Sequence, residues 1–292
     1  MVIVRLNGGL GNQLFQYATG RALACRKKVP LKLDITYFDE HNPRRYCLHH
    51  FKIRASLADQ NEINRLKRWE SRLHPRLLRL IARTIPYYRR SLFEEQNKDF
   101  YDPNINRAPR DVYLAGYWQS DRYFEDIASL LRAELVLSHP LDLESQTIAK
   151  EIQQTESVSV HVRRGDYVAN PEMRYLYGAP GADYYLRAIG RLSEIVKHPN
   201  LFLFSDDLTW TRQNIRPDFP VHYVCGHGRD RDVEEFSLMQ ECKYHIIANS
   251  SFSWWGAWLS NHHQKIVIAP KDWFNVPERS TEDRIPPSWI KI

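Results

Sequence analysis

The second half of this 292-residue chain alternates short apolar runs with helical patterns, and this alternation limits the folds that it can adopt. Most of the runs pass directly into polar residues. The apolar runs are residues 158–162, 201–204, 221–224, 244–248 and 265–269. Such alternation is typical of βαβ units that build a parallel sheet. Ligands bind these sheets beyond the carboxyl ends of the strands, so the polar tips are expected to gather there.

The first half begins in the same way. A predicted strand at residues 2–6 passes through a glycine loop at 7–12 into a helix at 13–26, and a second strand follows at 31–34. A further strand at 111–116 precedes a predicted helix at 122–135. We therefore expect an α/β protein with parallel sheets in both halves.

The length of the chain suits two domains of roughly 140 residues each. We predict a first domain over residues 1–150 and a second over 151–270. The last stretch, residues 271–292, contains prolines and aromatic residues, and we expect it to wrap in extended form and return to the first domain.

Composition excludes several classes of protein. No apolar run approaches the ~20 residues that span a bilayer, and the first residues lack the pattern of a secretory signal. Cys25, Cys47, Cys225 and Cys242 form no CxxC pair, which argues against a disulfide framework or a structural zinc site. These features predict a cytoplasmic location.

The charge of the chain is concentrated in one segment. Residues 62–90 hold nine basic and two acidic side chains, whereas the whole chain has a net charge of only +6. A near-neutral remainder does not favour nucleic-acid binding. The surrounding residues 56–92 predict a helical insertion, which either packs on its own domain with solvated arginines or lies on an anionic membrane surface as a peripheral helix.

The run SVSVHVRRGDY at 157–167 is the most informative motif. A predicted strand ends in Arg163, Arg164 and Asp166, and paired guanidinium donors match the oxygens of a phosphate. The alternative is an ordinary surface turn with solvated charges.

Two helix starts offer a second type of anion site. Gly9, Gly11, Asn12 and Gln13 follow a strand and open a helix, although their spacing does not match a dinucleotide fingerprint. Ser250 and Ser251 precede another helix. There they either cap it or join its N–H groups around a phosphate.

Acidic residues allow further alternatives. Glu235 near a helix start either interacts with the helix dipole or accepts hydrogen bonds from a guanine edge. A binding site for a divalent metal ion is suggested by Asp206-Asp207 and by the spacing of Asp230-Arg231-Asp232. However, adjacent aspartates in an extended chain point to opposite sides, and arginines flank the second motif. We therefore expect no metal.

Four blocks together carry a resemblance to a known family. They are GGLGNQLFQYATGRALA at 8–24, HVRRGDY at 161–167, FSDD at 204–207 and NSSFSWWGAWL at 249–259. With these blocks the chain resembles the bacterial α-1,2-fucosyltransferases of glycosyltransferase family 11. The resemblance runs from end to end, although residues 41–110 carry little of it.

The resemblance implies a GT-B-like fold of two Rossmann-like domains facing across a cleft, with GDP-fucose as donor, no required metal and a galactose-terminated glycan as acceptor. It places Arg163 on the β-phosphate, with Arg164 supporting the motif through Asp166. The remaining implied donor-site residues are His161 and Glu235 on the nucleoside, Ser250, Ser251 and Phe252 on the phosphates, Asp206 and Asn249 beside them, and Gly9, Gly11, Asn12 and Gln13 from the first domain.

Such a reaction needs stabilisation of the departing diphosphate and a base for the acceptor hydroxyl. Arg163 and helix-start N–H groups would supply the first. For the base we favour Asp166, with Glu172 and Asp34 as alternatives. Two other functions stay open: a GDP-fucose transferase of another linkage, and a non-catalytic module that binds nucleotide or glycan.

Overall fold

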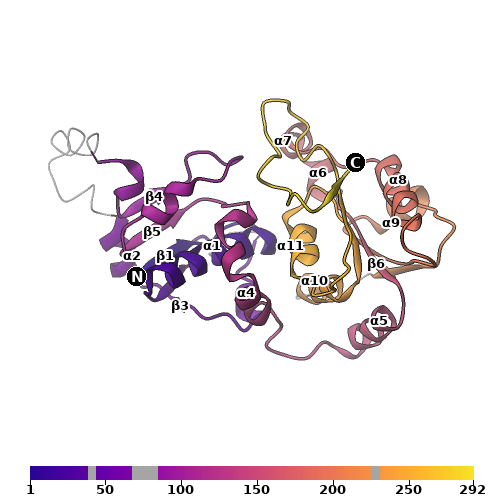
Figure 1. The fold of residues 1–292 in the computed structure, drawn as a ribbon, viewed down its shortest axis with the longest axis horizontal. Coiled ribbons are helices and arrows are strands. Elements are labelled where there is room, and N and C mark those ends of the chain that lie inside the picture. Colours follow the sequence, from indigo (N-terminus) through magenta and orange to yellow (C-terminus); the bar gives the residue numbers. More distant parts are fainter. Residues whose placement is uncertain (39–43, 68–84, 225–230) are drawn as a thin grey trace. The chain divides into compact units, whose positions relative to one another are not determined.

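The computed structural model describes residues 1–38, 44–67, 85–224 and 231–292. The chain forms two compact units, Met1–Leu135 and Val136–Ile292 (Figure 1). Each unit contains one sheet in which every paired strand is parallel. The predicted α/β class with two Rossmann-like domains is therefore confirmed.

The sheet of the first unit has the strand order β3-β2-β1-β5-β4. Its strands are β1 (Val2–Arg5), β2 (Leu31–Asp34), β3 (Ser56–Leu57), β4 (Leu92–Glu94) and β5 (Val112–Ala115). Strand β1 lies in the middle, with Val2 in register with both Leu31 and Val112. Its three apolar residues are fully buried, as expected for a strand that is covered on both faces.

Helix α1 (Leu10–Lys27) packs closely on this sheet. A side chain at Gly20 would meet Leu31 and Val4 at 3.0–3.1 Å, so glycine permits the close approach. The helix ends at Lys28, which adopts the left-handed conformation and donates a hydrogen bond from its N–H to the carbonyl of Cys25.

The helix predicted over 122–135 is shorter than expected. Two 3-10 turns, Asp121–Tyr123 and Glu125–Ile127, come first, and α4 (Ala128–Glu134) follows. Phe124 between the turns has φ −146° and ψ 8°, which is not helical. Both Tyr123 and Phe124 are buried, and this burial outweighs the local helical pattern.

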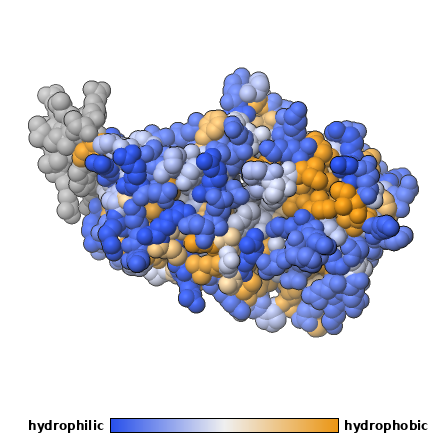
Figure 2. Space-filling model, viewed as in Figure 1, coloured by the Kyte–Doolittle hydropathy of each residue, from blue (hydrophilic) through white to orange (hydrophobic). Residues whose placement is uncertain are grey.

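The basic insertion is described only in part, because residues 68–84 lie outside the described chain. Helix α2 (Gln60–Lys67) buries Ile63 and Leu66 against Ile3 and Tyr113 of its own sheet. Among the described residues, no helix is both long and apolar enough to cross a membrane. Most of the face in Figure 2 is hydrophilic, with hydrophobic residues in separate patches.

The sheet of the second unit has the order β11-β10-β9-β6-β7-β8. Its strands are β6 (Ser157–Val162), β7 (Asn200–Ser205), β8 (Val221–Val224), β9 (Tyr244–Ile246), β10 (Val267–Ala269) and β11 (Ile290–Lys291). All six residues of β6 are buried, because β7 and β9 flank it.

Helices alternate with these strands as the sequence predicts. They are α5 (Leu143–Gln154), α6 (Gly165–Ala169), α7 (Pro171–Leu176), α8 (Ala182–Ser193), α9 (Leu208–Asn214), α10 (Arg231–Glu241) and α11 (Ser251–Leu259). The tryptophans of α11 are core residues, with Trp254 and Trp255 fully buried.

The division between the units falls at Leu135/Val136, earlier than the predicted 150/151. Helix α5 belongs to the second unit, where Ser145 hydrogen-bonds Glu234 of α10 at 2.6 Å. The stretch 271–292 also lies in the second unit, since β11 pairs with β10. Its pairing there differs from the expected return to the first domain.

Candidate active site

Arg163 stands at the carboxyl end of β6, and two carboxylates fix its guanidinium. Nη2 donates to Asp166 Oδ1 at 2.6 Å, and Nη1 lies 2.9 Å from Asp206 Oδ2. The guanidinium carbon lies 5.7 Å from the ring centroid of Tyr167. With 25% of its side chain exposed, Arg163 is held in place but remains accessible.

Glycine at position 165 makes this arrangement possible. A Cβ there would lie only 2.7 Å from Asp206 Oδ2. That contact is shorter than real side chains tolerate, so a larger residue would displace the carboxylate that holds Arg163. The glycine of the RRGD motif is thus required for packing.

Arg164 has different partners from Arg163. Its backbone N–H donates to Asp206 Oδ1 at 2.8 Å, and its Nε lies 3.2 Å from Asp207 Oδ2. The guanidinium stacks on Trp210 at 3.8 Å from the ring centroid. Asp166 contacts Arg163, whereas Arg164 contacts residues at the end of β7 and in α9, so the support of Arg164 through Asp166 stays a prediction.

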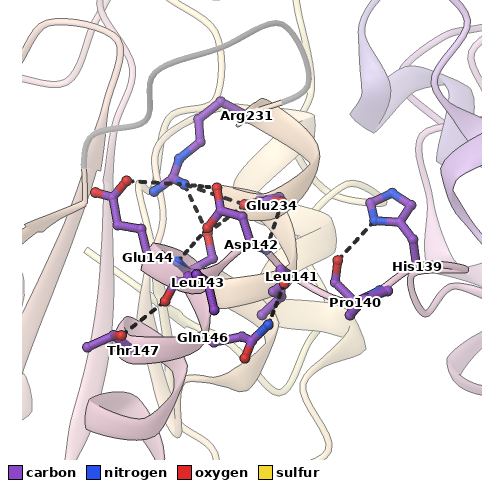
Figure 3. Close-up of polar contacts among 11 residues, drawn as sticks. His139, Pro140, Leu141, Asp142, Leu143, Glu144, Gln146, Thr147, Arg231 and Glu234 are labelled. Atoms are coloured by element: carbon purple, nitrogen blue, oxygen red, sulfur yellow. Dashed lines mark hydrogen bonds and ion pairs between the residues drawn. The ribbon is translucent and has the colours of Figure 1, made fainter.

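The first pair of aspartates considered for a metal is likewise occupied by arginines. Asp206 and Asp207 hold Arg163 and Arg164. In the second motif Arg231 contacts Asp142, Glu144 and Glu234 between the starts of α5 and α10 (Figure 3). The described part of the chain contains no group of three or more His, Cys, Asp or Glu side chains suited to a metal ion. Asp230 lies outside it.

His161 is buried one residue before the arginine pair. Burial, and secondly the charge of Arg163, lower the pKa of its imidazole to about 3. The ring is therefore neutral at physiological pH, and it lies 5.5 Å from the ring of Phe252. Its Nδ1 has no hydrogen-bond partner among the described residues. A buried polar atom of this kind is suited to a ligand that supplies the missing bond.

The start of α11 lies beside this ring. Ser250 caps the helix and accepts a long hydrogen bond from the N–H of Phe252 at 3.4 Å. Ser251 is the first helical residue and is partly exposed. Phe252 also contacts Phe236 of α10 at 5.5 Å, which places α10, the helix of Glu235, next to α11.

Asn249 has a structural task that the sequence does not reveal. Its side-chain amide donates to the carbonyls of Tyr177, Gly178 and Trp273 at 2.9–3.1 Å. Its own carbonyl accepts from the Tyr167 hydroxyl at 3.2 Å. The residue is 2% exposed, so it joins segments around the site without itself facing solvent.

In the first unit, the side-chain amide of Gln13 holds the glycine loop in place. Gly8 has φ +75°, and Gly9 precedes α1 without a side-chain cap. The Gln13 amide donates to the carbonyls of Gly8 and Arg45, while its oxygen accepts from the N–H of Cys47 at 2.9 Å. Gln13 is fully buried, and Gly11 beside it is also buried. Both the nitrogen and the oxygen of the Gln13 side-chain amide are therefore used in contacts that stabilise the fold.

The alternative bases are in contrasting settings. Asp34 is fully buried and hydrogen-bonds Tyr113 and Thr36. Burial opposes these bonds, but together they lower the pKa of its carboxyl. Glu172 is exposed on α7. Asp166, the favoured base, is engaged by the Arg163 guanidinium, an arrangement that suits positioning of the arginine.

Several contacts around these residues were not visible in the sequence. Tyr167 beside Arg163 and Trp210 beneath Arg164 are brought there by α6 and α9. In the first unit, Trp118 adopts a left-handed backbone, φ 56°, just beyond β5. Nothing in the letters Gly-Tyr-Trp-Gln-Ser at 116–120 predicts that conformation.

The sequence profile of Glycosyl transferase family 11 matches residues 104–292. This chain belongs to glycosyltransferase family 11. The tip of β6, the tip of β7 and the start of α11 all lie within the matched part of this family 11 chain.

Two relatives from Escherichia coli span nearly the whole chain. The family 11 chain is 35% identical to an alpha-1,2-colitosyltransferase, covering 100% of this chain and 99% of the relative. It is 30% identical to the O-antigen biosynthesis glycosyltransferase WbnK, covering 98% and 99%. A galactoside alpha-(1,2)-fucosyltransferase 1 from Leontocebus fuscicollis is 27% identical over 57% of this chain and 46% of the relative.

Solved structures support the fold. Arabidopsis thaliana FUT1 mutant R284K in complex with GDP matches with a TM-score of 0.52 and 12% identity, covering 93% of this chain and 71% of that one. POFUT1 in complex with GDP matches with a TM-score of 0.50 and 13% identity, covering 90% and 96%. At such low identity the likeness concerns architecture alone, and it agrees with a GT-B fold.

Proposed function

We propose that this family 11 enzyme transfers L-fucose from GDP-fucose to the 2-hydroxyl of a terminal galactose on a glycan acceptor, with inversion at the anomeric carbon. The observation that carries the proposal is Arg163, partly exposed at the end of β6 and oriented by Asp166 and Asp206. Bond cleavage leaves negative charge on the β-phosphate, and a preoriented guanidinium stabilises charge where it develops.

The residues around Arg163 support a nucleoside diphosphate as the group that is bound. The Ser250–Phe252 helix start offers backbone N–H groups to phosphate oxygens. The neutral His161 and the ring of Phe252 offer a polar atom and an aromatic face to a nucleoside. Glu235 on the neighbouring helix would accept hydrogen bonds from guanine.

We further propose that no metal is needed, because guanidinium charge occupies the position that a cation takes in other transferases. The test is turnover after extensive treatment with EDTA. Unchanged activity supports the proposal. Loss of activity that manganese restores would instead revive a metal site at an aspartate pair.

Colitose is a second candidate for the transferred sugar, because the 35% identical relative is named for it. Colitose is L-fucose without the 3-hydroxyl. A site that hydrogen-bonds this hydroxyl would reject the deoxy donor by about 10⁴-fold. An apolar site shaped for the deoxy sugar would reject fucose by only about 100-fold. The ratio of kcat/KM for the two GDP donors therefore decides between them.

The acceptor and linkage are tested together. The purified enzyme is incubated with GDP-fucose and a panel of glycans that end in galactose, glucose or N-acetylglucosamine, and the product bond is assigned by NMR. An α-1,2 bond to galactose is expected. Another bond would indicate a transferase of different linkage, and absence of turnover with both donors would favour a non-catalytic binding module.

A further inference from the structure

The ring of Tyr167 lies beside the guanidinium on which the proposed reaction depends. Helix α6 brings this ring to 5.7 Å from the guanidinium carbon of Arg163, within the ~6 Å over which a cation and an aromatic face attract each other. The ion pairs of Arg163 with Asp166 and Asp206 involve its two terminal nitrogens. The ring adds a third contact, of a different kind, that restrains the same group.

Tyr167 is itself held by a column of aromatic rings. Its ring stacks on Tyr177, with centroids 5.1 Å apart and planes inclined by 9°, and Tyr177 contacts Phe274 at 5.4 Å between centroids. The three rings come from α6, from the end of α7 and from the C-terminal stretch, which are separate segments of the second unit. Stacking on Tyr177 limits the positions that the Tyr167 ring can take.

The backbone around this column is tied to one residue, Asn249. The Tyr167 hydroxyl donates to the Asn249 carbonyl at 3.2 Å, and the Asn249 amide donates to the carbonyls of Tyr177 and Trp273. Burial raises the pKa of the Tyr167 hydroxyl, so this group keeps its proton and acts as a donor. Asn249 directly precedes the cap of α11, so the Tyr167 ring and the start of that helix share one set of contacts.

We propose that Tyr167 is a positioning residue of the transfer reaction, whose ring holds the Arg163 guanidinium in the orientation that meets the departing diphosphate. This inference rests on the proposed function and adds a residue to it. Negative charge develops on the diphosphate as the sugar leaves, and a guanidinium that is already in place stabilises this charge without reorganisation. In this role Tyr167 acts through Arg163.

The first variant is Tyr167→Leu, which replaces the ring by an apolar side chain. With the GDP donor that the wild type uses, kcat should fall by about tenfold, the value of one partly buried cation–π contact. KM for the acceptor should change by less than about twofold, because the lost restraint concerns charge that develops in the transition state. Tyr167→Phe keeps the ring and its stack on Tyr177, so it should retain kcat to within about threefold.

A double-mutant cycle shows whether the ring acts through the arginine. In an Arg163→Ala background the guanidinium is absent, so Tyr167→Leu should change the remaining kcat by less than about twofold. A residue that merely supports the fold would lower kcat by the same factor in both backgrounds. Tyr244→Phe is the matched control: it removes a tyrosine hydroxyl that bonds to Glu156 at the amino end of the sheet, and it should leave kcat unchanged.

Tyr177→Leu provides a second measurement if Tyr167→Leu does not fold. It removes the stack but leaves the Tyr167 ring beside the arginine, so kcat should fall by about threefold. This loss should also disappear in the Arg163→Ala background. Urea unfolding followed by tryptophan fluorescence establishes that each variant is folded before its kinetics are measured.

Three results would overturn the inference: near-normal kcat in a folded Tyr167→Leu variant, the same fractional loss from a leucine variant with and without the Arg163 side chain, or a loss in Tyr167→Phe as large as in Tyr167→Leu. In each case the wild type still transfers sugar, and the proposed function stands. If the wild type transfers sugar from neither donor, the proposed function fails and this inference falls with it.

Discussion

The two units use the same position of the same kind of sheet in different ways. At the carboxyl end of β1, Gln13 and Gln16 are fully buried and their amides bond to the backbone of their own unit. At the carboxyl ends of β6 and β7, Arg163 and Asp206 keep about a quarter of their side chains exposed. The first arrangement stabilises a loop, whereas the second leaves charge available to a ligand.

Arg163→Ala should have the largest effect if this contrast is right. Loss of one donor that stabilises developing charge costs about 3–4 kcal/mol, so kcat should fall on the order of a thousandfold. Arg163→Lys, which keeps the charge but not the paired donors, is the matched control and should lose less. Turnover by a folded Arg163→Ala variant at the wild-type rate would contradict the assignment.

Acid should destabilise the second unit selectively, because two buried neutral histidines lie in its sheet. Burial lowers the pKa of both His161 and His245 to about 3, whereas the unfolded value is about 6.5. The unfolded state therefore binds more protons, and stability is lost as pH falls below 6.5. Between pH 7.5 and 5 we expect a loss of about 2 kcal/mol for each.

Urea unfolding followed by tryptophan fluorescence at both pH values measures this loss. His245→Gln should lower the stability at pH 7.5 but weaken its dependence on pH. His263→Gln, at an exposed position, is the control and should keep the wild-type dependence. Equal stability of the wild type at the two pH values would show that neither histidine is held neutral by the fold.

Gln13→Ala tests the structural role of the buried amides at the carboxyl end of β1. It leaves the Cys47 N–H and the carbonyls of Gly8 and Arg45 without their partner, and the free energy of unfolding should fall by about 1–3 kcal/mol. GDP affinity should stay unchanged. Gln96→Ala, on an exposed side chain, should change neither quantity. A stable Gln13→Ala variant with weakened donor binding would assign this amide to the ligand.

Arg164→Lys should have the smallest effect. It removes the stacking on Trp210, worth about 1 kcal/mol, while the backbone bond to Asp206 persists. Titration calorimetry should find GDP affinity reduced by about fivefold. A loss as large as that of Arg163→Ala would mean that both arginines contact the phosphates.

Local patterns in the sequence were sufficient to predict most of the sheet. The strands at 31–34 and 221–224 have the predicted bounds, because short apolar runs between turns leave little choice. β11 was missed because its two residues form a strand only through pairing with β10. The helix expected from 122 failed because burial of Tyr123 and Phe124 overrides local propensity.

The candidate site was predictable in residue type but not in pairing. The motif placed Arg163 at a strand tip, since strand and motif are adjacent in sequence. Its contact with Asp206 depends on the alignment of β6 with β7, in which Val162 lies opposite Ser205. The left-handed backbone of Trp118, whose N–H donates to Glu95, is likewise a tertiary outcome that no local rule anticipates.

The three hydrogen bonds of the Asn249 amide have a practical consequence for engineering. They connect the helix start at Ser250 to residues 177–178 and to Trp273, which are remote in sequence. Hybrids between family members that exchange only one of these stretches would combine mismatched backbones around a buried amide. Recombination between family members should therefore exchange residues 166–178 and residues 271–292 together, from the same parent.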